Sequence, residues 1–464
     1  MSRQPLTAPI RFLEPPPFPH SPLSPGNGYE SPGETEFNFM QGSAIPGTQS
    51  RPRTARTLST TFIPRVLGGS HANQSIDMVV EKQPAPVRVR FKDRIALYQW
   101  TWFTMTMATG GIANLLHSIP YRSEWLRVSG VCFYLFNLLL FITNCVLITM
   151  RFWMRKGSFV GSFTDQVESL FIPSFVVSIA TILINTCEYG LERTGPWLQH
   201  CLEYMFWMYI ILAVASSASM YLVLWSTTMF PIHTMTPVWV FPAYPLLLTA
   251  PFASNLIAQA GLKNHTIHAM SIAICAVTVQ GTGFLISFMV IASFLYRLMT
   301  QKLPKDTQRP GVFISIGPSG FTVAGIVHLG SMAHDILPED GFLGENRDLV
   351  AAIIKITSVF VGLWLWGLSV WFFFVSVGSL FKYIRPSHRG LPFLMTWWSF
   401  VFPNTALVTA TEALGKVFES EALKIAGCIM AGVLVCVWFL VFGTMVRAIY
   451  QRKLLWPVKD TLPK

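Results

Sequence analysis

Residues 204–264 read YMFWMYIILAVASSASMYLVLWSTTMFPIHTMTPVWVFPAYPLLLTAPFASNLIAQAGLKN and contain one charged residue, Lys263. As a single helix this run would extend roughly 90 Å, about three times the thickness of the hydrocarbon core of a bilayer. Pro231, His233 and Pro237 interrupt it near its middle. The stretch therefore predicts two membrane-spanning helices joined by a turn, and an all-α integral membrane protein.

The composition of the whole chain agrees with a membrane protein. Of its 464 residues 52% are hydrophobic and 12% are charged, about half of the ~25% charged residues of a soluble domain, and the mean hydropathy is +0.47. A single soluble core is excluded. We assign the net charge of +11 to loops that face anionic lipid, and we expect no nucleic-acid partner because no RNA-binding, zinc-finger or heptad pattern is present.

Stretches that have few or no charged residues and can cross about 30 Å predict ten spans, the least regular of which contains Lys355. Their approximate limits are 96–117, 128–150, 169–188, 204–226, 238–260, 267–296, 312–333, 349–380, 394–415 and 422–446. We expect residues 91–450 to form the transmembrane domain. The proline-rich segment 1–90 is predicted to be a disordered cytoplasmic tail, and residues 451–464 a short cytoplasmic tail.

The basic residues of the connecting segments predict the orientation. With a cytoplasmic N-terminus, the inside segments carry nineteen Lys and Arg residues and the outside segments carry seven. Positive charge gathers on the cytoplasmic side of membrane proteins, so both termini are predicted to be cytoplasmic.

Proline occurs in every odd span from the third onward and in none of the even spans: Pro173; Pro242, Pro245 and Pro251; Pro318; Pro403. The first span has Thr109, Gly110 and Gly111 instead, and we expect the two glycines to act as a flexible pair. Freed backbone groups are tolerated only where they face protein or a water-filled cavity. The alternation predicts five helical hairpins with kinked odd helices inside and straight even helices outside, although proline is common in membrane helices generally.

Broken helices place N-termini inside the membrane, where free N–H groups and the positive end of the helix dipole favour an anion. Few carboxylates are available to hold a cation. Glu412 is the only one clearly near the interior of a span, and its neighbour Lys416 is expected to form a local ion pair with it. Glu188 and Glu203 lie at outer ends. The sequence therefore predicts an anion pathway.

The chain resembles the fungal malic acid transport proteins of the tellurite-resistance/dicarboxylate transporter family, a group of the voltage-dependent anion channel superfamily. The matching stretches are WFTMTMATGG at 102–111, TPVWVFP at 236–242, QRPGVF at 308–313, Gly317-Pro318, WSFVFPN at 398–404, Gly415-Lys416 and MVRA at 445–448. The resemblance covers residues 90 to 460. It implies ten helices in five hairpins around a central pore, a homotrimer with one pore per subunit, and kinship with plant guard-cell slow anion channels and fungal sulfite pumps.

The resemblance also implies site residues. In the channel relatives a phenylalanine of a Trp-x-aromatic-x-Phe motif closes the pore, and here it matches Phe402, with Phe400 as a second candidate. The expected lining of the anion path consists of Thr109, Gly110, Gly111, Pro242, Gly317, Pro318, Phe321, Pro403 and Asn404.

Two further residues of the spans could act on a proton or an anion. His328 is a candidate proton relay, and the alternative is a hydrogen-bonded structural histidine. Lys355 either attracts anions or extends to the membrane interface.

We therefore expect a plasma-membrane transporter of malate and other C4-dicarboxylates, driven by protons or by the gradient of the anion itself. A sulfite efflux pump and a gated anion channel are the alternatives, and a membrane acyltransferase that uses His328, or His334 with Asp335, is a remote one. No motif predicts a cofactor or a metal site, and Gly415-Lys416 lacks the other residues of a phosphate-binding loop. We expect no enzymatic activity.

Overall fold

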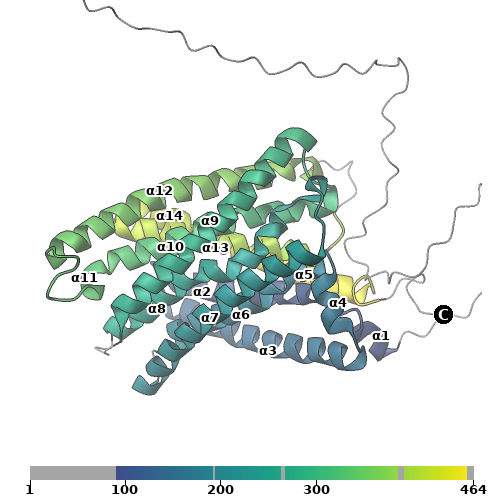
Figure 1. Ribbon diagram of the computed structural model, residues 1–464, viewed down its shortest axis with the longest axis horizontal. Helices are drawn as coiled ribbons and strands as arrows, with labels where there is room; N and C mark the ends of the chain where they lie inside the picture. The colour runs from purple at the N-terminus through teal and green to yellow at the C-terminus, as the bar shows by residue number, and fades with distance from the viewer. Residues whose placement is uncertain (1–89, 192–193, 263–266, 385–390, 457–464) are drawn as a thin grey trace, which may run out of the picture. The chain divides into compact units, whose positions relative to one another are not determined.

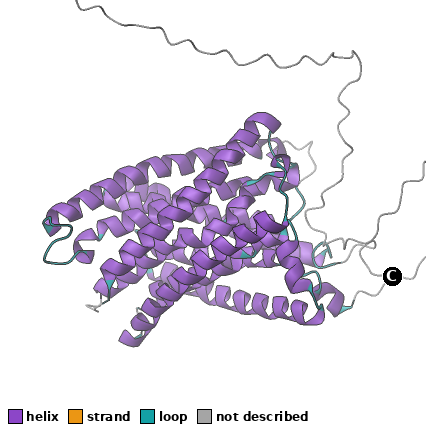
Figure 2. Cartoon of the chain, viewed as in Figure 1, coloured by secondary structure: helices purple, strands orange, loops and turns teal. Residues whose placement is uncertain are grey.

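The computed structural model describes residues 90–191, 194–262, 267–384 and 391–456. These residues form helices joined by loops, with no strand among them (Figure 2). The prediction of an all-α protein is confirmed. The predicted N-terminal tail lies outside the described residues except for Arg90, and so does most of the C-terminal tail, residues 457–464.

Eight helical segments are long and apolar enough to cross a membrane, which makes this a multi-pass membrane protein. They are Glu124–Met154, Glu168–Gly190, Pro196–Thr227, Pro237–Gly261, Ala269–Gln301, Asp306–Ser331, Arg347–Tyr383 and Glu421–Tyr450. The other two predicted spans, 96–117 and 394–415, contain α2 (Phe103–Ser118) and α13 (Phe402–Val417). Each of these helices has 16 residues, fewer than the ~20 that an α-helix needs to cross the hydrocarbon core.

Five long helices form an outer set with an apolar surface that faces away from the protein. They are α3 (Glu124–Met154), α7 (Pro196–Thr227), α9 (Ala269–Gln301), α12 (Arg347–Ser379) and α14 (Glu421–Tyr450). Only 17–33% of their most apolar stretches is buried, and large side chains such as Leu135, Phe288 and Trp364 are exposed. Such a surface is stable against lipid rather than water.

Five broken segments form an inner set, in which a short or 3-10 helical part precedes an α-helix. They are η1 (Trp100–Trp102) with α2, α5 (Glu168–Phe171) with α6 (Pro173–Asn185), η4 (Pro237–Leu248) with α8 (Thr249–Leu262), η5 (Asp306–Ile316) with α10 (Gly317–Ser331), and η7 (Met395–Phe400) with α13. Pro173, Pro318 and Pro403 lie in the first turn of their α-helices, where a missing N–H costs no hydrogen bond. These three prolines therefore mark where α6, α10 and α13 begin.

The inner segments contact one another in a closed ring. α2 contacts α6, α6 contacts η4 and α8, α8 contacts α10, α10 contacts α13, and α13 returns to α2. Each outer helix packs on an inner segment, as α12 does on α10 and α3 on α2. In Figure 1 α3 and α12 lie at opposite edges of the bundle with the inner helices between them. In the three inner segments of the membrane-spanning set, 72–94% of the most apolar stretch is buried.

Short elements complete the described chain. They are α1 (Phe91–Ile95), α4 (Ser158–Thr164), the π-helical turn η2 (Thr186–Gly190), η3 (Ile232–Thr234), α11 (Ala333–Ile336) and η6 (Phe381–Ile384).

The glycine pair of the first span does not break its helix, and our prediction on this point is wrong. α2 continues through Gly110 and Gly111, and the change from 3-10 to α-helix lies at Trp102 and Phe103. A Cβ atom on Gly110 would lie 2.6 Å from Thr181 Oγ1. The glycine is needed because α2 and α6 approach each other closely here.

Gly320 makes the corresponding contact between α10 and α13, and it provides a test of the ring. A Cβ atom there would lie 2.8 Å from the carbonyl carbon of Ala406, a backbone atom that cannot rotate away. We expect Gly320→Ala to destabilise the protein by about 1–3 kcal/mol through overpacking. Gly281→Ala on α9 is the matched control, because nothing lies within 4 Å of its Cβ position. Thermal unfolding followed by size-exclusion chromatography measures both, and equal stabilities would contradict the close contact.

Candidate functional site

The inner segments enclose a cavity of about 270 Å³. Its polar lining consists of Asn114, His117, Ser118, Thr181, Glu188, Ser254, Asn255, Gln259, His328, Ser331, Thr405, Thr409, Glu412 and Lys416. Apart from Leu248, the lining residues lie on the α-helix that follows the first part of each inner segment or, for Glu188, on the turn η2 after it, so the cavity occupies one end of the ring. Ser331 and Lys416 are exposed at this end.

Aromatic rings from three inner segments close the other end of the cavity. Phe402, at the start of α13, is fully buried, and the centroid of its ring lies 5.0 Å from that of Phe321 and 6.1 Å from that of Tyr244. Tyr244 is held in place because its hydroxyl donates a 2.5 Å hydrogen bond to the carbonyl of Ile314. A Cβ atom on Gly111 would lie 3.2 Å from Phe402 Cδ2, so α2 presses against the same ring.

Four of the predicted site residues line the cavity: Gly111, Phe321, His328 and Phe402. The structure places others elsewhere. The Thr109 hydroxyl accepts a 3.2 Å bond from Trp438 Nε1 of α14, and Asn404 Nδ2 donates to the Phe400 carbonyl at 2.9 Å. Lys355 lies on the exposed face of α12.

The remaining predicted residues support the walls of the ring. Gly110 permits the close approach of α2 and α6, and Gly317 makes room for the Tyr244 hydroxyl. Pro242 lies within η4, and Pro403 is in the first turn of α13. Pro318 lines a separate apolar cavity of about 60 Å³ together with residues of α9 and α12.

Phe400 packs against other aromatic rings. Its half-buried ring packs edge-on against Phe313 at 5.2 Å and lies 5.7 Å from Trp397. It is not among the residues that line the cavity.

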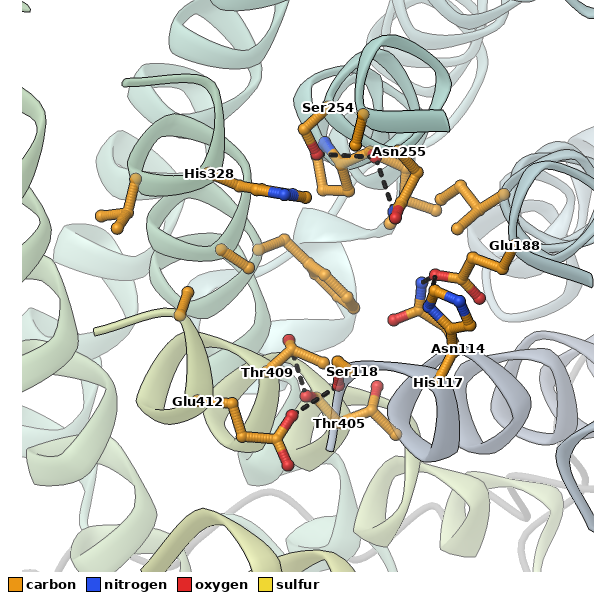
Figure 3. Close-up of a pocket in the computed structure, with 18 of the residues that line it drawn as sticks. Asn114, His117, Ser118, Glu188, Ser254, Asn255, His328, Thr405, Thr409 and Glu412 are labelled. Carbon is orange, nitrogen blue, oxygen red and sulfur yellow. Dashed lines mark hydrogen bonds and ion pairs between the residues drawn. The ribbon is translucent and has the colours of Figure 1, made fainter. Parts of the chain in front are cut away.

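One acidic group of the cavity is centred on Glu188. Its Oε1 accepts a 2.6 Å hydrogen bond from Asn114 Nδ2 and lies 3.8 Å from His117 Nδ1. Figure 3 shows Glu188, Asn114 and His117 together on one wall, with His328 across the cavity. Sequence reasoning missed Asn114 and His117 as site residues. The sequence did contain one sign of this face of α2. Gly111, Asn114 and Ser118 have helical spacing, which places these three cavity residues on the same side of the helix.

The second acidic group is centred on Glu412. Its Oε2 accepts a 2.5 Å bond from Ser118 Oγ. The described residues show no ion pair between Glu412 and Lys416 within 4.0 Å, so the predicted pair is wrong. The Glu412 carboxylate is instead hydrogen-bonded to Ser118 of the neighbouring helix α2. Lys416 still acts electrostatically on both acids.

The chemistry of the lining suits a small oxyanion. Hydroxyl, amide and ammonium groups donate hydrogen bonds to carboxylate or sulfite oxygens. The helices α8 and α13 begin at the aromatic end of the cavity, with Thr249 and Phe402 as their first residues. Their dipoles add positive potential there.

Comparisons with known proteins agree with an anion pathway. The sequence profile of the family described as voltage-dependent anion channel matches residues 98–446. A malic acid transport protein of Schizosaccharomyces pombe is 27% identical over 392 residues, which cover 84% of this chain and 86% of that protein. A sulfite efflux pump of Arthroderma benhamiae is 25% identical over 346 residues, which cover 74% of this chain and 89% of that one.

Proposed function

Because the chain belongs to the voltage-dependent anion channel family, we propose that it transports malate and related C4-dicarboxylates through the cavity of its inner ring. The observation that carries this proposal is the cavity inside the ring, with hydrogen-bond donors on its wall and packed aromatic rings at one end. The similarity to a malic acid transport protein supports this choice among anions.

We propose that α2 and α13, with the 3-10 segments before them, cross the membrane as the first and ninth of ten spans. The contacts that support this are those of the closed ring, in which α2 and α13 have the same place as the three longer inner segments. Ten spans form five hairpins around a pore, put both termini in the cytoplasm, and leave residues 1–90 and 451–464 as cytoplasmic tails. The proposed assembly is a plasma-membrane homotrimer surrounded by lipid.

We propose that Phe402 is the gate of this path and that Phe321 and Gly111 form the surface against which it closes. The complete burial of the Phe402 ring and its packing against Phe321, both at the cavity lining, support this assignment. Rotation or displacement of the ring would connect the cavity with the far side, where η4, η5 and η7 meet. Steric closure by an apolar ring also excludes water, which raises the barrier for an ion.

The decisive experiment measures uptake of labelled malate and labelled sulfite by proteoliposomes that contain the full chain. Malate uptake above that of empty liposomes, and faster than sulfite uptake, supports the proposal. Faster sulfite flux would favour a sulfite efflux pump, which the second group of relatives suggests. Flux of neither anion would contradict the proposed function. Uptake driven by an imposed pH gradient would show proton coupling.

The orientation makes a prediction that can be tested separately from transport. Cysteines introduced singly at Leu343, in the loop between α11 and α12, and at Lys305, before η5, should differ in their reaction with a membrane-impermeant maleimide applied to intact cells. We expect labelling at 343 and none at 305. The nineteen-to-seven bias of basic residues predicts that the loop with Leu343 faces the outside and that Lys305 faces the cytoplasm. The opposite pattern would invert the topology and place the cavity on the cytoplasmic side.

A further inference from the structure

Glu188 is a buried acid that the local backbone directs into the anion cavity. α6 ends in the π-helical turn η2, a rare distortion that often occurs at functional sites. Tyr189 anchors this turn, because its hydroxyl donates a 2.7 Å bond to the Ala113 carbonyl of α2. The turn places Glu188, which is 1% exposed, against Asn114 and His117.

A carboxylate at this position opposes the proposed function. The cavity lining has two acids, Glu188 and Glu412, and one lysine, Lys416, so its formal charge with neutral histidines is 1 − 2 = −1. An entering anion would be repelled, and repulsion between like charges a few ångströms apart is strong in a partly dehydrated site. One proton makes the lining neutral and removes this barrier.

Glu188 is better placed than Glu412 to take that proton. Each acid has one bonded oxygen and one oxygen without a hydrogen-bond partner among the described residues, Oε2 of Glu188 and Oε1 of Glu412. Glu188 differs because a second titratable group, His117, lies 3.8 Å from its carboxylate. Glu412 is turned toward α14, where its Cγ lies 2.7 Å from the Cβ position of Gly427, and Ser118 holds its other side.

The groups around Glu188 fit such a role. His117 is 3.8 Å away and can share the proton. Arg122, in the loop after α2, and Lys416 act on Glu188 electrostatically, and Cys187 precedes it on η2. The residues that α8 contributes to the lining are all uncharged, and the polar ones are Ser254, Asn255 and Gln259. His328 lies on the opposite wall (Figure 3).

We propose that the Glu188 carboxylate, assisted by His117, binds one proton when an anion occupies the cavity. This inference rests on the proposed function and assigns the proton to a residue. The proton comes from water, adds to a carboxylate oxygen and returns to water when the anion leaves, and no other bond changes. The two binding events are linked, and linkage is reciprocal. If the anion increases the affinity of Glu188 for a proton by a given factor, the bound proton increases the affinity for the anion by the same factor.

The test is malate uptake by proteoliposomes at external pH values from 6.5 to 8.5, where both malate carboxyls remain ionised because carboxyl pKa values are near 4. For the wild type we expect KM to fall by up to tenfold per pH unit as the pH is lowered, the limit for one linked proton. Glu188→Gln should remove this dependence. Glu203→Gln should keep it, because Glu203 pairs with His268 outside the cavity.

The outcomes separate the two proposals. Loss of the pH dependence in Glu412→Gln, with its retention in Glu188→Gln, would overturn the assignment to Glu188. A wild-type KM that does not change with pH would overturn the inference and leave anion transport intact. Flux of neither malate nor sulfite would overturn the proposed function and this inference with it.

A measurement on the wild type keeps the inference testable if Glu188→Gln does not fold. Malate is added at pH 7.5 to purified full-length protein in weakly buffered detergent that contains a pH-indicator dye. We expect uptake of up to one proton per bound malate. Saturable binding of malate, followed by isothermal titration calorimetry, without proton uptake would overturn the inference.

Discussion

Replacing Phe402 by alanine is expected to raise anion flux by about tenfold or more. The ring is fully buried where the cavity ends, in contact with Phe321 and Tyr244. A conformation in which it has moved aside is a minor state, and minor states of this kind are populated to about 10% or less. Removing the ring makes the open path permanent. The measurement is malate flux per folded protein, normalised by recovery from size-exclusion chromatography.

Phe400→Ala is the matched control for this prediction. Phe400 is two residues away, but its ring packs against Phe313 and Trp397 outside the cavity. We expect its replacement to lower stability and leave flux per folded protein unchanged. If Phe402 serves only as packing, Phe402→Ala will cost about 3–5 kcal/mol of stability and flux will fall or stay the same. An increase for Phe400→Ala alone would move the gate to that residue.

The inner segments show how far sequence reasoning reaches. Proline was found only in odd spans, and the structure gives the physical reason: Pro318 and Pro403 begin α-helices that follow 3-10 segments. The same logic failed for Gly110, because glycine has two uses in a membrane helix. It can loosen the backbone, or it can let another helix approach, and only the position of Thr181 shows which applies.

The lining of the cavity was harder to predict than its helices. Phe321 and His328 were identified from the sequence, whereas Asn114 and His117 were not. Their role depends on where Glu188 points, and this depends on a π-helical turn that no residue pattern in the sequence predicts. Hydrophobic periodicity gives the inward face of a helix, but the partner across a cavity is a property of the packed structure.

A buried ion pair at the end of the bundle remote from the cavity supports the ring from outside. Arg151, near the end of α3, makes two hydrogen bonds to Glu168, the first residue of α5, and its Nη2 lies 2.9 Å from Glu168 Oε2. Both side chains are nearly inaccessible. The Trp100 amide also donates to Glu168 Oε1 at 3.4 Å, so the carboxylate joins the first two inner segments to an outer helix.

Breaking this pair from either side is expected to cause the largest loss of stability among the variants considered. Arg151→Met leaves a buried carboxylate unpaired and Glu168→Leu leaves a buried guanidinium unpaired, and each should cost about 3–5 kcal/mol. The double variant Arg151→Met/Glu168→Leu should recover most of that loss, because it removes both charges and fills the space with apolar groups.

The control is Lys424→Met, which removes a partly exposed pair with Glu421 and should have little effect on stability. Thermal unfolding in one detergent measures all four variants, and additive losses in the double variant would show that the two charges do not stabilise each other.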